Sequence, residues 1–349
     1  MRSSYREDDV TMLLKDITGL VEPQPTEERE RLIQSGRHYS EMLPIEYVPT
    51  QKYMEVYQEA LERFSEPTAL AVGRLSDKIM QAKGKDVVLV SLARAGIPIG
   101  ILVKHYIRQK YNIDVPHYSI SIIKGRGIDD NAMKYLLKRY EPQQLLFVDG
   151  WIGKGAILNE LKKDIEAYEG VSADIAVIAD PANVTELCGT HDDILIPSSC
   201  LNSTISGLVS RTFLRDDIIG PDDFHGAVYY GELADSDLSY AFIDAIERHF
   251  CMDTPPEDRP IEGYGADEVA VLANVFDVDD INLIKPGIGE TTRVLLRRVP
   301  WKVLIDKRYQ DSQELSHIVR LAEEKNVPIE FYPLEHYKCC GIIKKLAEA

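Results

Sequence analysis

Residues 145–157, LLFVDGWIGKGAI, decide the predicted fold. The stretch opens with four apolar residues, which predict a buried strand of a parallel sheet because such strands are covered on both faces. The strand runs into the carboxylate of Asp149, and a helical pattern begins at Ala156. Strand, short loop and helix in this order are typical of α/β proteins, whose ligands bind at the carboxyl ends of the strands. Asp149 therefore stands where a ligand is expected.

The loop between this strand and helix has the composition of a phosphate cradle. Gly153, Lys154 and Gly155 precede Ala156. Glycines allow backbone N–H groups to turn toward an anion, and the helix N-terminus adds a partial positive charge. Lys154 can add a full positive charge. The spacing excludes both a Walker loop and a Rossmann fingerprint. An ordinary strand-to-helix turn remains the alternative.

A second strand–loop–helix unit precedes the first. Residues 87–90 (VVLV) predict a strand, and a helix is expected to begin near residue 97, where Pro98 fits the first turn. The loop between them is a second candidate for anion binding, with a plain turn and a surface arginine as the alternative. Its candidate residues are Ser91, Ala93, Arg94, Ala95 and Gly96.

The segment between the two units carries two cations. Lys124 and Arg126 alternate with Gly125 and Gly127 after residues 117–123, which predict a strand. Glycines at these positions leave the backbone flexible, and the two positive charges suit a polyanion. The segment is either a mobile loop over an anionic ligand or a solvated turn.

Together the two units resemble type I phosphoribosyltransferases. The ribose-phosphate signature of that family is an apolar strand, two acidic residues, two apolar residues and a Thr/Gly-rich loop. Aligned on Asp149, this chain keeps the strand, the first acid, the apolar pair Trp151-Ile152 and Gly155, but Gly150 replaces the second acid. The resemblance implies transfer of a ribosyl 5-phosphate unit from phosphoribosyl diphosphate to an unidentified base, assisted by Mg²⁺.

The resemblance also implies residue roles. Asp149 would hold the ribose hydroxyls, and Arg94 with the amides of residues 91–96 would bind the diphosphate through its planar fork. Lys124 and Arg126 would lie on a loop that closes over the diphosphate and excludes water. The 5-phosphate would lie on Gly153, Lys154, Gly155 and Ala156. Because the second acid is missing, a nucleotide sensor without catalytic activity stays an alternative.

Cys200 suggests a different class of activity. It follows residues 193–197 (DILIP), an expected strand, in a polar segment that could also hydrogen-bond a base. With His191, His225 or His249 it would make a thiol protease, but one sequence does not place these residues together. A small, partly buried thiol is the alternative. The five cysteines show no CxxC spacing, so neither a zinc site nor a disulfide framework is predicted, and no metal ligand is identified.

A proline-rich linker divides the chain. Residues 252–263 (MDTPPEDRPIEG) separate a body at residues 41–251, preceded by an extension at residues 1–40, from a small domain at residues 264–349. Strands at 303–305 and 329–331, a helix at 313–325 and a final helix at 341–347 predict an α/β/α sandwich, expected to fold alone.

The small domain carries a second resemblance. Residues 287–293 (GIGETTR) resemble the signature of the pelota and ribosomal-protein type of RNA-binding domain, with Gly289 in place of its asparagine. The resemblance implies binding of structured RNA through Gly287, Glu290 and Arg293. A structural domain without RNA is the alternative.

The composition bounds the remaining expectations. The net charge of −17 contrasts with residues 281–349, where 12 Lys/Arg face 9 Asp/Glu; this distribution argues against a general nucleic-acid coat. No apolar run approaches the roughly 20 residues of a membrane span, and the N-terminus lacks a signal-peptide core, so a reduced cytoplasmic setting without membrane partners is expected. A homodimer is compatible with the sequence.

The pairing of the two domains resembles a bacterial family associated with tellurite resistance and stress, also labelled cysteine protease StiP. The predicted fold class is α/β, with a parallel-sheet phosphoribosyltransferase-like domain and a small α/β/α sandwich.

Overall fold

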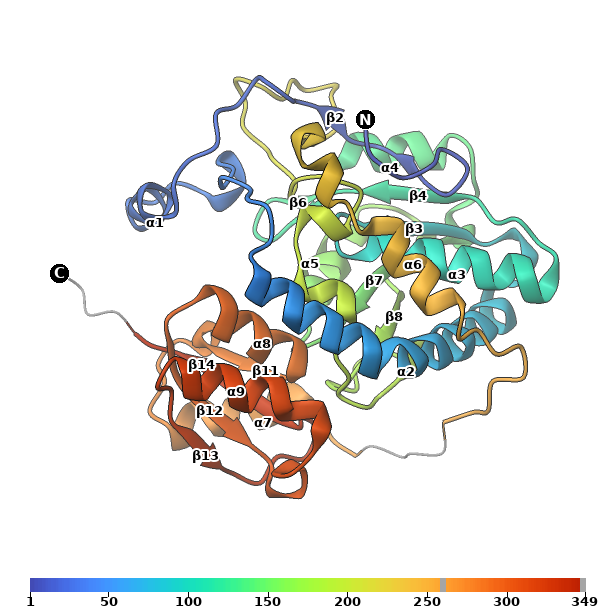
Figure 1. Cartoon of the computed structure of the whole chain (residues 1–349). Helices are drawn as coiled ribbons and strands as arrows, with labels where there is room; N and C mark the ends of the chain where they lie inside the picture. Colours follow the sequence, from blue (N-terminus) through green and yellow to red (C-terminus); the bar gives the residue numbers. More distant parts are fainter. Residues whose placement is uncertain (258–261, 346–349) are drawn as a thin grey trace.

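The computed structural model (Figure 1) describes residues 1–257 and 262–345. Its main sheet has six strands, all parallel. In spatial order they are β1 (Thr11–Met12), β4 (His117–Ile120), β3 (Val88–Leu92), β7 (Leu145–Trp151), β8 (Ile175–Ala179) and β9 (Cys188–Thr190). The chain passes from β3 to β4 on one side and then returns to place β7 on the other side of β3. The carboxyl ends of β3 and β7 therefore flank the switch point where such sheets bind ligands.

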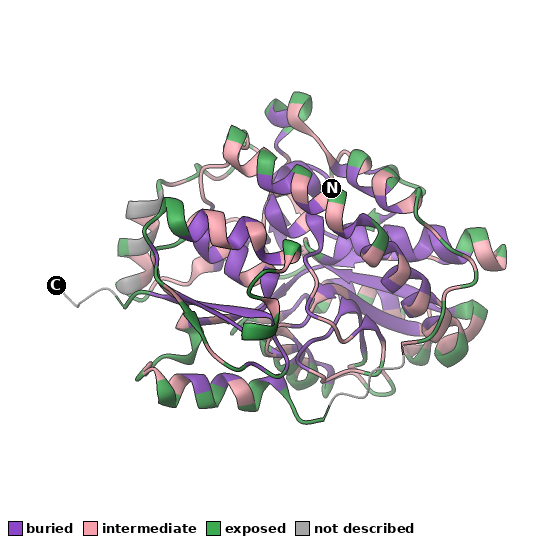
Figure 2. Ribbon diagram, turned by 60° about the horizontal axis from the view of Figure 1, so that its bottom comes forward, coloured by how far each residue is buried: buried purple, intermediate pink, exposed green. Residues whose placement is uncertain are grey.

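Helices cover both faces of this sheet. Along β7, Leu146 and Val148 pack into one apolar cluster while Leu145 and Phe147 pack into another, as expected for side chains that alternate across a strand. The first face is covered by α2 (Gln51–Lys83), α3 (Gly96–Tyr111) and α6 (Ser239–Glu247). The second is covered by α4 (Asp130–Leu137) and α5 (Ala156–Ile165). Figure 2 shows buried residues concentrated in the strands and in the helix faces turned toward them.

Short elements complete the body. Residues 1–40 contribute the edge strand β1, the helix α1 (Thr26–Gln34) and β2 (Lys15–Asp16), which pairs with β10 (Gly226–Ala227). A hairpin of β5 (Ile122–Ile123) and β6 (Gly127–Ile128) holds the expected mobile loop as a tight turn. Short 3-10 helices are η1 (Tyr39–Glu41), η2 (Gly84–Asp86), η3 (Pro142–Gln144), η4 (Pro197–Cys200), η5 (Ser203–Ile205) and η6 (Gly231–Ser236).

The C-terminal domain is an α/β/α sandwich, as predicted. Its mixed sheet has the order β11-β14-β12-β13. Val303 and Ile305 face two helices, whereas Leu304 between them faces the third. The strands are β11 (Ile284–Pro286), β12 (Pro300–Ile305), β13 (Ile329–Phe331) and β14 (Cys339–Ile343). The helices are α7 (Gly265–Val275) on one face, α8 (Ile288–Arg297) and α9 (Ser316–Glu324) on the other, with single turns η7 (Ile281–Leu283), η8 (Lys307–Tyr309) and η9 (Gln313–Leu315).

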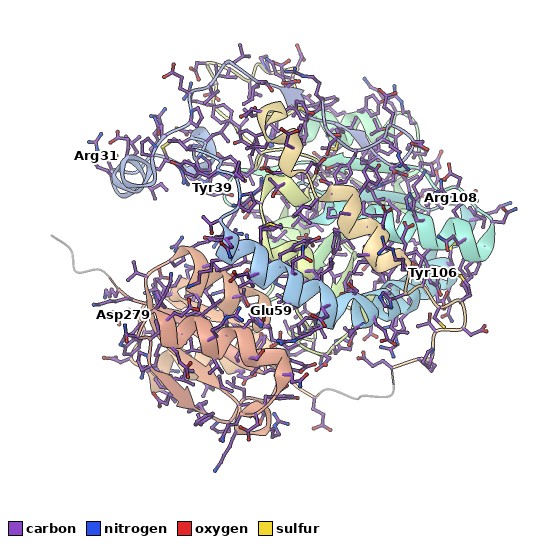
Figure 3. All side chains as sticks on the ribbon, viewed as in Figure 1. Arg31, Tyr39, Glu59, Tyr106, Arg108 and Asp279 are labelled. Carbon is purple, nitrogen blue, oxygen red and sulfur yellow. The ribbon has the colours of Figure 1, made fainter. Side chains whose placement is uncertain are left out.

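The C-terminal domain packs firmly against the body. Apolar residues of α8 and α9 belong to the same buried cluster as α2 and α3, so one core runs through both parts. At the edge of this core, Arg320 of α9 pairs with Glu59 of α2. Figure 3 labels Glu59 where α2 runs beside the C-terminal domain. An isolated domain would expose this apolar face to water, so the expectation that residues 264–349 fold alone loses its support.

Helix α2 is one long helix that continues through Pro67. Two sequence expectations about local structure were wrong. Residues 193–196 form no strand. The edge strand of the sheet is β9, a few residues earlier, and Asp193 accepts hydrogen bonds from the C-terminal domain. The final helix is instead β14, a strand between β11 and β12; its last expected residues lie outside the described residues. Within the described residues, no helix combines the length and apolarity needed to span a bilayer.

Candidate functional site

A cleft of about 260 Å³ opens at the carboxyl ends of β3 and β7. The body and the C-terminal domain both line it, which the sequence did not indicate. From the body come Ala95, Asp149, Trp151, residues 152–158 and Ile175; from the C-terminal domain come Lys285, Pro286, Glu290 and Arg293. The volume lies just below the roughly 300–1,000 Å³ of typical small-ligand sites, so a small ligand fits.

The loop after β3 forms one edge of the cleft. Gly96 begins α3 so close to β7 that a Cβ there would lie 2.3 Å from the carbonyl oxygen of Val148. Of the five predicted anion-binding residues in this loop, Ala95 lines the cleft. Ser91 is fully buried and its hydroxyl donates to the carbonyl oxygen of Gly96 at 3.0 Å, while the amide of Ala93 donates within the sheet at 2.8 Å. Ser91 and Ala93 therefore position the loop and do not line the cleft.

Asp149 lies on the floor of the cleft. Its Oδ1 accepts a hydrogen bond of 2.7 Å from the amide of Gly150. Burial raises the pKa of Asp149 to about 6, against the lowering effects of that bond and of the Arg293 charge. At neutral pH the carboxyl is mostly ionised, and Oδ2 can accept hydrogen bonds from hydroxyl groups.

The glycine loop opens directly into the cleft. Gly155 caps α5 with φ of +83°, a left-handed conformation that favours glycine. The amides of Ala156, Ile157 and Leu158 belong to the first turn, where the helix itself offers no acceptor, and all three residues line the cleft. This loop and helix match the predicted phosphate cradle.

Lys154 is held by the opposite domain. Its Nζ donates to the carbonyl oxygens of Ile281 at 2.6 Å and Ile284 at 3.0 Å. Burial, together with repulsion from Lys285 and Lys124, lowers the pKa of Lys154 to about 8. The lysine therefore contributes charge to the cleft while its hydrogen bonds join the two domains.

The signature residues of the C-terminal domain face the cleft and the body. Glu290 and Arg293 line the cleft, with the Arg293 guanidinium 5.8 Å from the ring centroid of Trp151. The start of α8 is capped by the body: Asp193 accepts from the amide of Ile288 at 2.9 Å and from that of Lys338 at 2.9 Å. The predicted RNA-binding residues thus meet the body and not an open surface.

Replacing Asp193 by alanine is expected to loosen this docking. The carboxyl is 4% exposed, so its loss would leave two buried amides without acceptors at about 1–3 kcal/mol each. We expect the free energy of unfolding in urea to fall by about 2–6 kcal/mol, measured by tryptophan fluorescence with Trp151 as a reporter in the cleft. Asp192→Ala is the control, since Lys338 keeps Glu314 as a second partner. Equal effects of both variants would contradict this role of Asp193.

The cleft is positively charged in an acidic protein. Three cations, Lys154, Lys285 and Arg293, line it together with the carboxylates Asp149 and Glu290, whereas the whole chain carries −17. Cations gathered in a partly buried cleft repel one another unless an anion joins them. The charge therefore favours an anionic ligand.

Three predicted cations do not reach the cleft. Arg94 donates to the carbonyl oxygen of Val209 at 2.8 Å and to Asn202 at 3.2 Å. Arg126 pairs with Glu41 at 2.6 Å, and Lys124 lies 3.5 Å from Asn282. The hydrogen bonds of Arg94 hold its guanidinium outside the cleft. The contacts of Arg126 and Lys124 fix the hairpin turn, so the mobile loop expected to close over a ligand is not seen in this arrangement.

The thiols of Cys200 and Cys188 are buried, whereas Cys251 is exposed. Burial raises the pKa of Cys200 to about 12, and its fully buried side chain forms no hydrogen bond to a histidine within the described residues. The structure instead places Cys188 Sγ 3.3 Å from Nε2 and 3.7 Å from Nδ1 of His191, whose Nδ1 lies 2.9 Å from the carbonyl oxygen of Asp180. Cys188 is also fully buried, and burial raises its pKa to about 12. Neither thiol is poised as a thiolate.

The sequence did not indicate the place of three residues. Trp151 and Lys285 line the cleft, although Trp151 was recognised only in an apolar pair and Lys285 was expected only to add a phosphate contact to RNA. Asp193 was assigned to a strand, and nothing local marks it as the cap of a helix 95 residues away. Only the packing of the two domains gives these residues their places.

Two solved structures that match part of this chain are phosphoribosyltransferases. A hypoxanthine-guanine phosphoribosyltransferase of Bacillus anthracis matches with a TM-score of 0.26 and 17% identity, covering 35% of this chain and 71% of that chain. A xanthine-guanine-hypoxanthine phosphoribosyltransferase of Helicobacter pylori matches with a TM-score of 0.23 and 16% identity, covering 39% and 77%. At such low scores the fold class rests on the strand order and connections described above.

Similarity in sequence relates this chain to known proteins more firmly than these structural matches do. A curated protein of Acinetobacter baylyi named "Cysteine protease StiP" is 35% identical over 367 residues, covering 99% of this chain and 94% of the relative. Residues 264–345 match the model of the PELOTA RNA binding domain. Residues 3–247 match the model described as the tellurite-like stress resistance cysteine protease StiP, and the chain belongs to this family.

Proposed function

We propose that the cleft binds a phosphorylated ribose and that the chain transfers a ribosyl 5-phosphate unit from phosphoribosyl diphosphate to a base. The observation that carries this proposal is the meeting of Asp149 and the first turn of α5 in one cleft at the switch point of the sheet. The amides of Ala156, Ile157 and Leu158 would bind the 5-phosphate, as anions bind at helix N-termini. Asp149 would accept hydrogen bonds from the ribose hydroxyls.

The chemistry asked of the protein is positioning and charge stabilisation. The bond between ribose C1 and the diphosphate oxygen breaks, the diphosphate leaves with the electron pair, and a nitrogen of the acceptor base forms the new bond to C1 while its proton passes to solvent. Cations that face the departing diphosphate stabilise its developing charge. Because Gly150 stands in place of the second acid, Asp149 is the carboxylate of β7 that would face the ribose.

Mg²⁺ fits this proposal as a companion of the diphosphate. Within the described residues, no cluster of three or more His, Cys, Asp or Glu side chains forms a metal cage. Mg²⁺ commonly keeps several waters and binds through substrate phosphates and one or two carboxylates. Asp149 and Glu290, which line the cleft, are the carboxylates that would hold it, and the ion would neutralise part of the diphosphate charge.

Two measurements test the proposal. The first is isothermal titration with phosphoribosyl diphosphate and Mg²⁺. The second is an assay of diphosphate release with purine and pyrimidine bases. Binding with release supports a transferase. Binding without release for any base would leave the nucleotide sensor. Absence of binding would reject both.

The pKa of Asp149 predicts how binding depends on pH. With a pKa of about 6, the carboxyl passes from mostly ionised at pH 7 to about 90% protonated at pH 5. The affinity for ribose 5-phosphate should therefore fall about tenfold relative to that for ethyl phosphate, a monoester that titrates alike but has no hydroxyl groups. An affinity ratio that stays constant from pH 7 to 5 would show that Asp149 does not hold the hydroxyls.

A thiol peptidase is the second candidate. The family description and the name of the Acinetobacter baylyi relative favour this alternative over the transferase. Cys188 beside His191 is the pair that could serve it, but only if the strand edge opens and exposes the thiol. Covalent trapping by a peptide-like electrophile, lost in Cys188→Ser but kept in Cys200→Ser, would establish this activity. Trapping lost only in Cys200→Ser would restore the nucleophile expected from the sequence.

RNA is a proposed partner on the strength of the PELOTA match. RNA contact through Gly287, Glu290 and Arg293 would require the C-terminal domain to leave the body, because Asp193 occupies the amide of Ile288 at the start of α8 and that of Lys338. In the docked arrangement Gly287 is buried, and Glu290 and Arg293 line the cleft.

A further inference from the structure

Two buried arginines near Arg293, Arg94 and Arg297, make their hydrogen bonds to neutral oxygens and not to carboxylates. Arg94 and Arg297 both donate to Oδ1 of Asn202, at 3.2 and 2.7 Å, so a single neutral oxygen joins two guanidinium groups. The Nε of Arg297 is buried and has no hydrogen-bond partner among the described residues. Burial, with repulsion from Arg293 and Arg94, lowers the pKa of Arg297 to about 10. Three arginines from two domains thus converge where each disfavours the charge of the others.

Arg293 is the member of this group that reaches the cleft. It lines the cavity, its side chain is 40% exposed, and its contact with Glu290 is 3.5 Å long, at the limit of a hydrogen bond. Lys154 and Arg94, by contrast, each donate two hydrogen bonds to protein oxygens. The guanidinium of Arg293 can therefore turn toward a ligand without breaking a strong bond.

The position of Arg293 selects one part of the ligand. The 5-phosphate is assigned to the first turn of α5, with Lys154 and Lys285 beside it. The Arg293 guanidinium lines the cleft 5.8 Å from the ring centroid of Trp151, two residues beyond Asp149, and its charge lowers the pKa of both Asp149 and Arg94. The group expected there is the diphosphate, whose charge would compensate the arginines and whose oxygens fit the guanidinium fork.

We infer that Arg293 of the C-terminal domain binds the diphosphate of the ligand, so that the site is complete only when both domains are docked. The inference rests on the proposed function. It assigns to a helix of RNA-binding type a contact with a small molecule, and it makes the docked arrangement the one that binds.

Titrations with two ligands on the full chain test this inference. Arg293→Ala should weaken binding of phosphoribosyl diphosphate with Mg²⁺ about 10- to 100-fold, the usual effect of a lost hydrogen bond to a charged group. It should leave the affinity for ribose 5-phosphate, which lacks the diphosphate, within about twofold of wild type. Arg293→Lys, which keeps the charge but not the fork, should lose less than about tenfold.

Arg320→Ala is the matched control. Arg320 belongs to the same domain and pairs with Glu59 outside the cleft, so its loss should leave both affinities unchanged. Equal binding by Arg293→Ala and wild type would overturn the inference and leave the proposed function standing. An equal loss for both ligands would also overturn the assignment to the diphosphate. If wild type and Arg320→Ala both fail to bind, the proposed function falls and the inference with it.

Discussion

Asp149→Asn is expected to lower the affinity for ribose 5-phosphate about a hundredfold, or about 3 kcal/mol, while the fold survives. Because Oδ1 of Asp149 accepts the amide of Gly150, an asparagine would keep its oxygen there. Its NH₂ group would then face the cleft where Oδ2 now lies. A group that only accepts would become one that only donates, and ribose hydroxyls would lose their charged partner.

Ethyl phosphate provides the control for this variant. It carries the phosphate but no hydroxyl group, so titration should show nearly the same affinity for wild type and Asp149→Asn. The midpoint of urea unfolding should not fall, since the substitution removes a partly desolvated charge. A variant that binds both ligands as wild type does would remove Asp149 from the site.

Gly96→Ala is expected to destabilise the protein by at least about 2 kcal/mol and to abolish ligand binding. The new Cβ would lie 2.3 Å from the carbonyl oxygen of Val148 and 3.2 Å from the Cα of Asp149. Both obstacles are backbone atoms of a central strand, so α3 must move away from β7. That movement would loosen the packing between α3 and β7 under the cleft and would displace Asp149 itself.

Gly150→Ala is the matched control, one position beyond Asp149 on the same strand. A Cβ at Gly150 would meet nothing within 4 Å, so we expect a change in unfolding free energy of less than about 0.5 kcal/mol. Urea unfolding of both variants makes the comparison. Equal midpoints for the two variants would mean that the close approach of α3 to β7 is not tight.

The elements nearest the site could be predicted from the sequence because their signals are local. The apolar run of β7, the glycines after it and the helical pattern of α5 lie within about 20 residues of one another and follow the rules for a strand–loop–helix unit. The strands of the C-terminal sandwich at β12 and β13 were recognised in the same way. Both domains of the predicted fold class were therefore confirmed.

Other elements depend on contacts that no local pattern records. Residues 341–343 form an apolar run too short to distinguish a helix from a strand; β11 and β12 on either side make it a strand. Arg94 was assigned to a diphosphate from its place in the loop, but Val209 and Asn202, more than 100 residues away, hold its guanidinium.

The composition of the cleft was the largest gap. Sequence reasoning placed Asp149 and the glycine loop in one site and Glu290 and Arg293 in another, each with its own ligand. The docking of α8 through Asp193 and the hydrogen bonds of Lys154 to residues 281 and 284 bring the two sets together. An interface of this kind is decided by shape and by buried hydrogen bonds across the domains, and neither has a sequence period.

A crystal structure of the full chain with phosphoribosyl diphosphate and Mg²⁺ tests most directly whether the two domains share one ligand site. We expect the 5-phosphate on the amides of Ala156, Ile157 and Leu158, the ribose hydroxyls on Asp149, and the diphosphate against Arg293. Ligand density outside the cleft, or an empty cleft at saturating ligand while the ligand is bound elsewhere, would contradict a shared site.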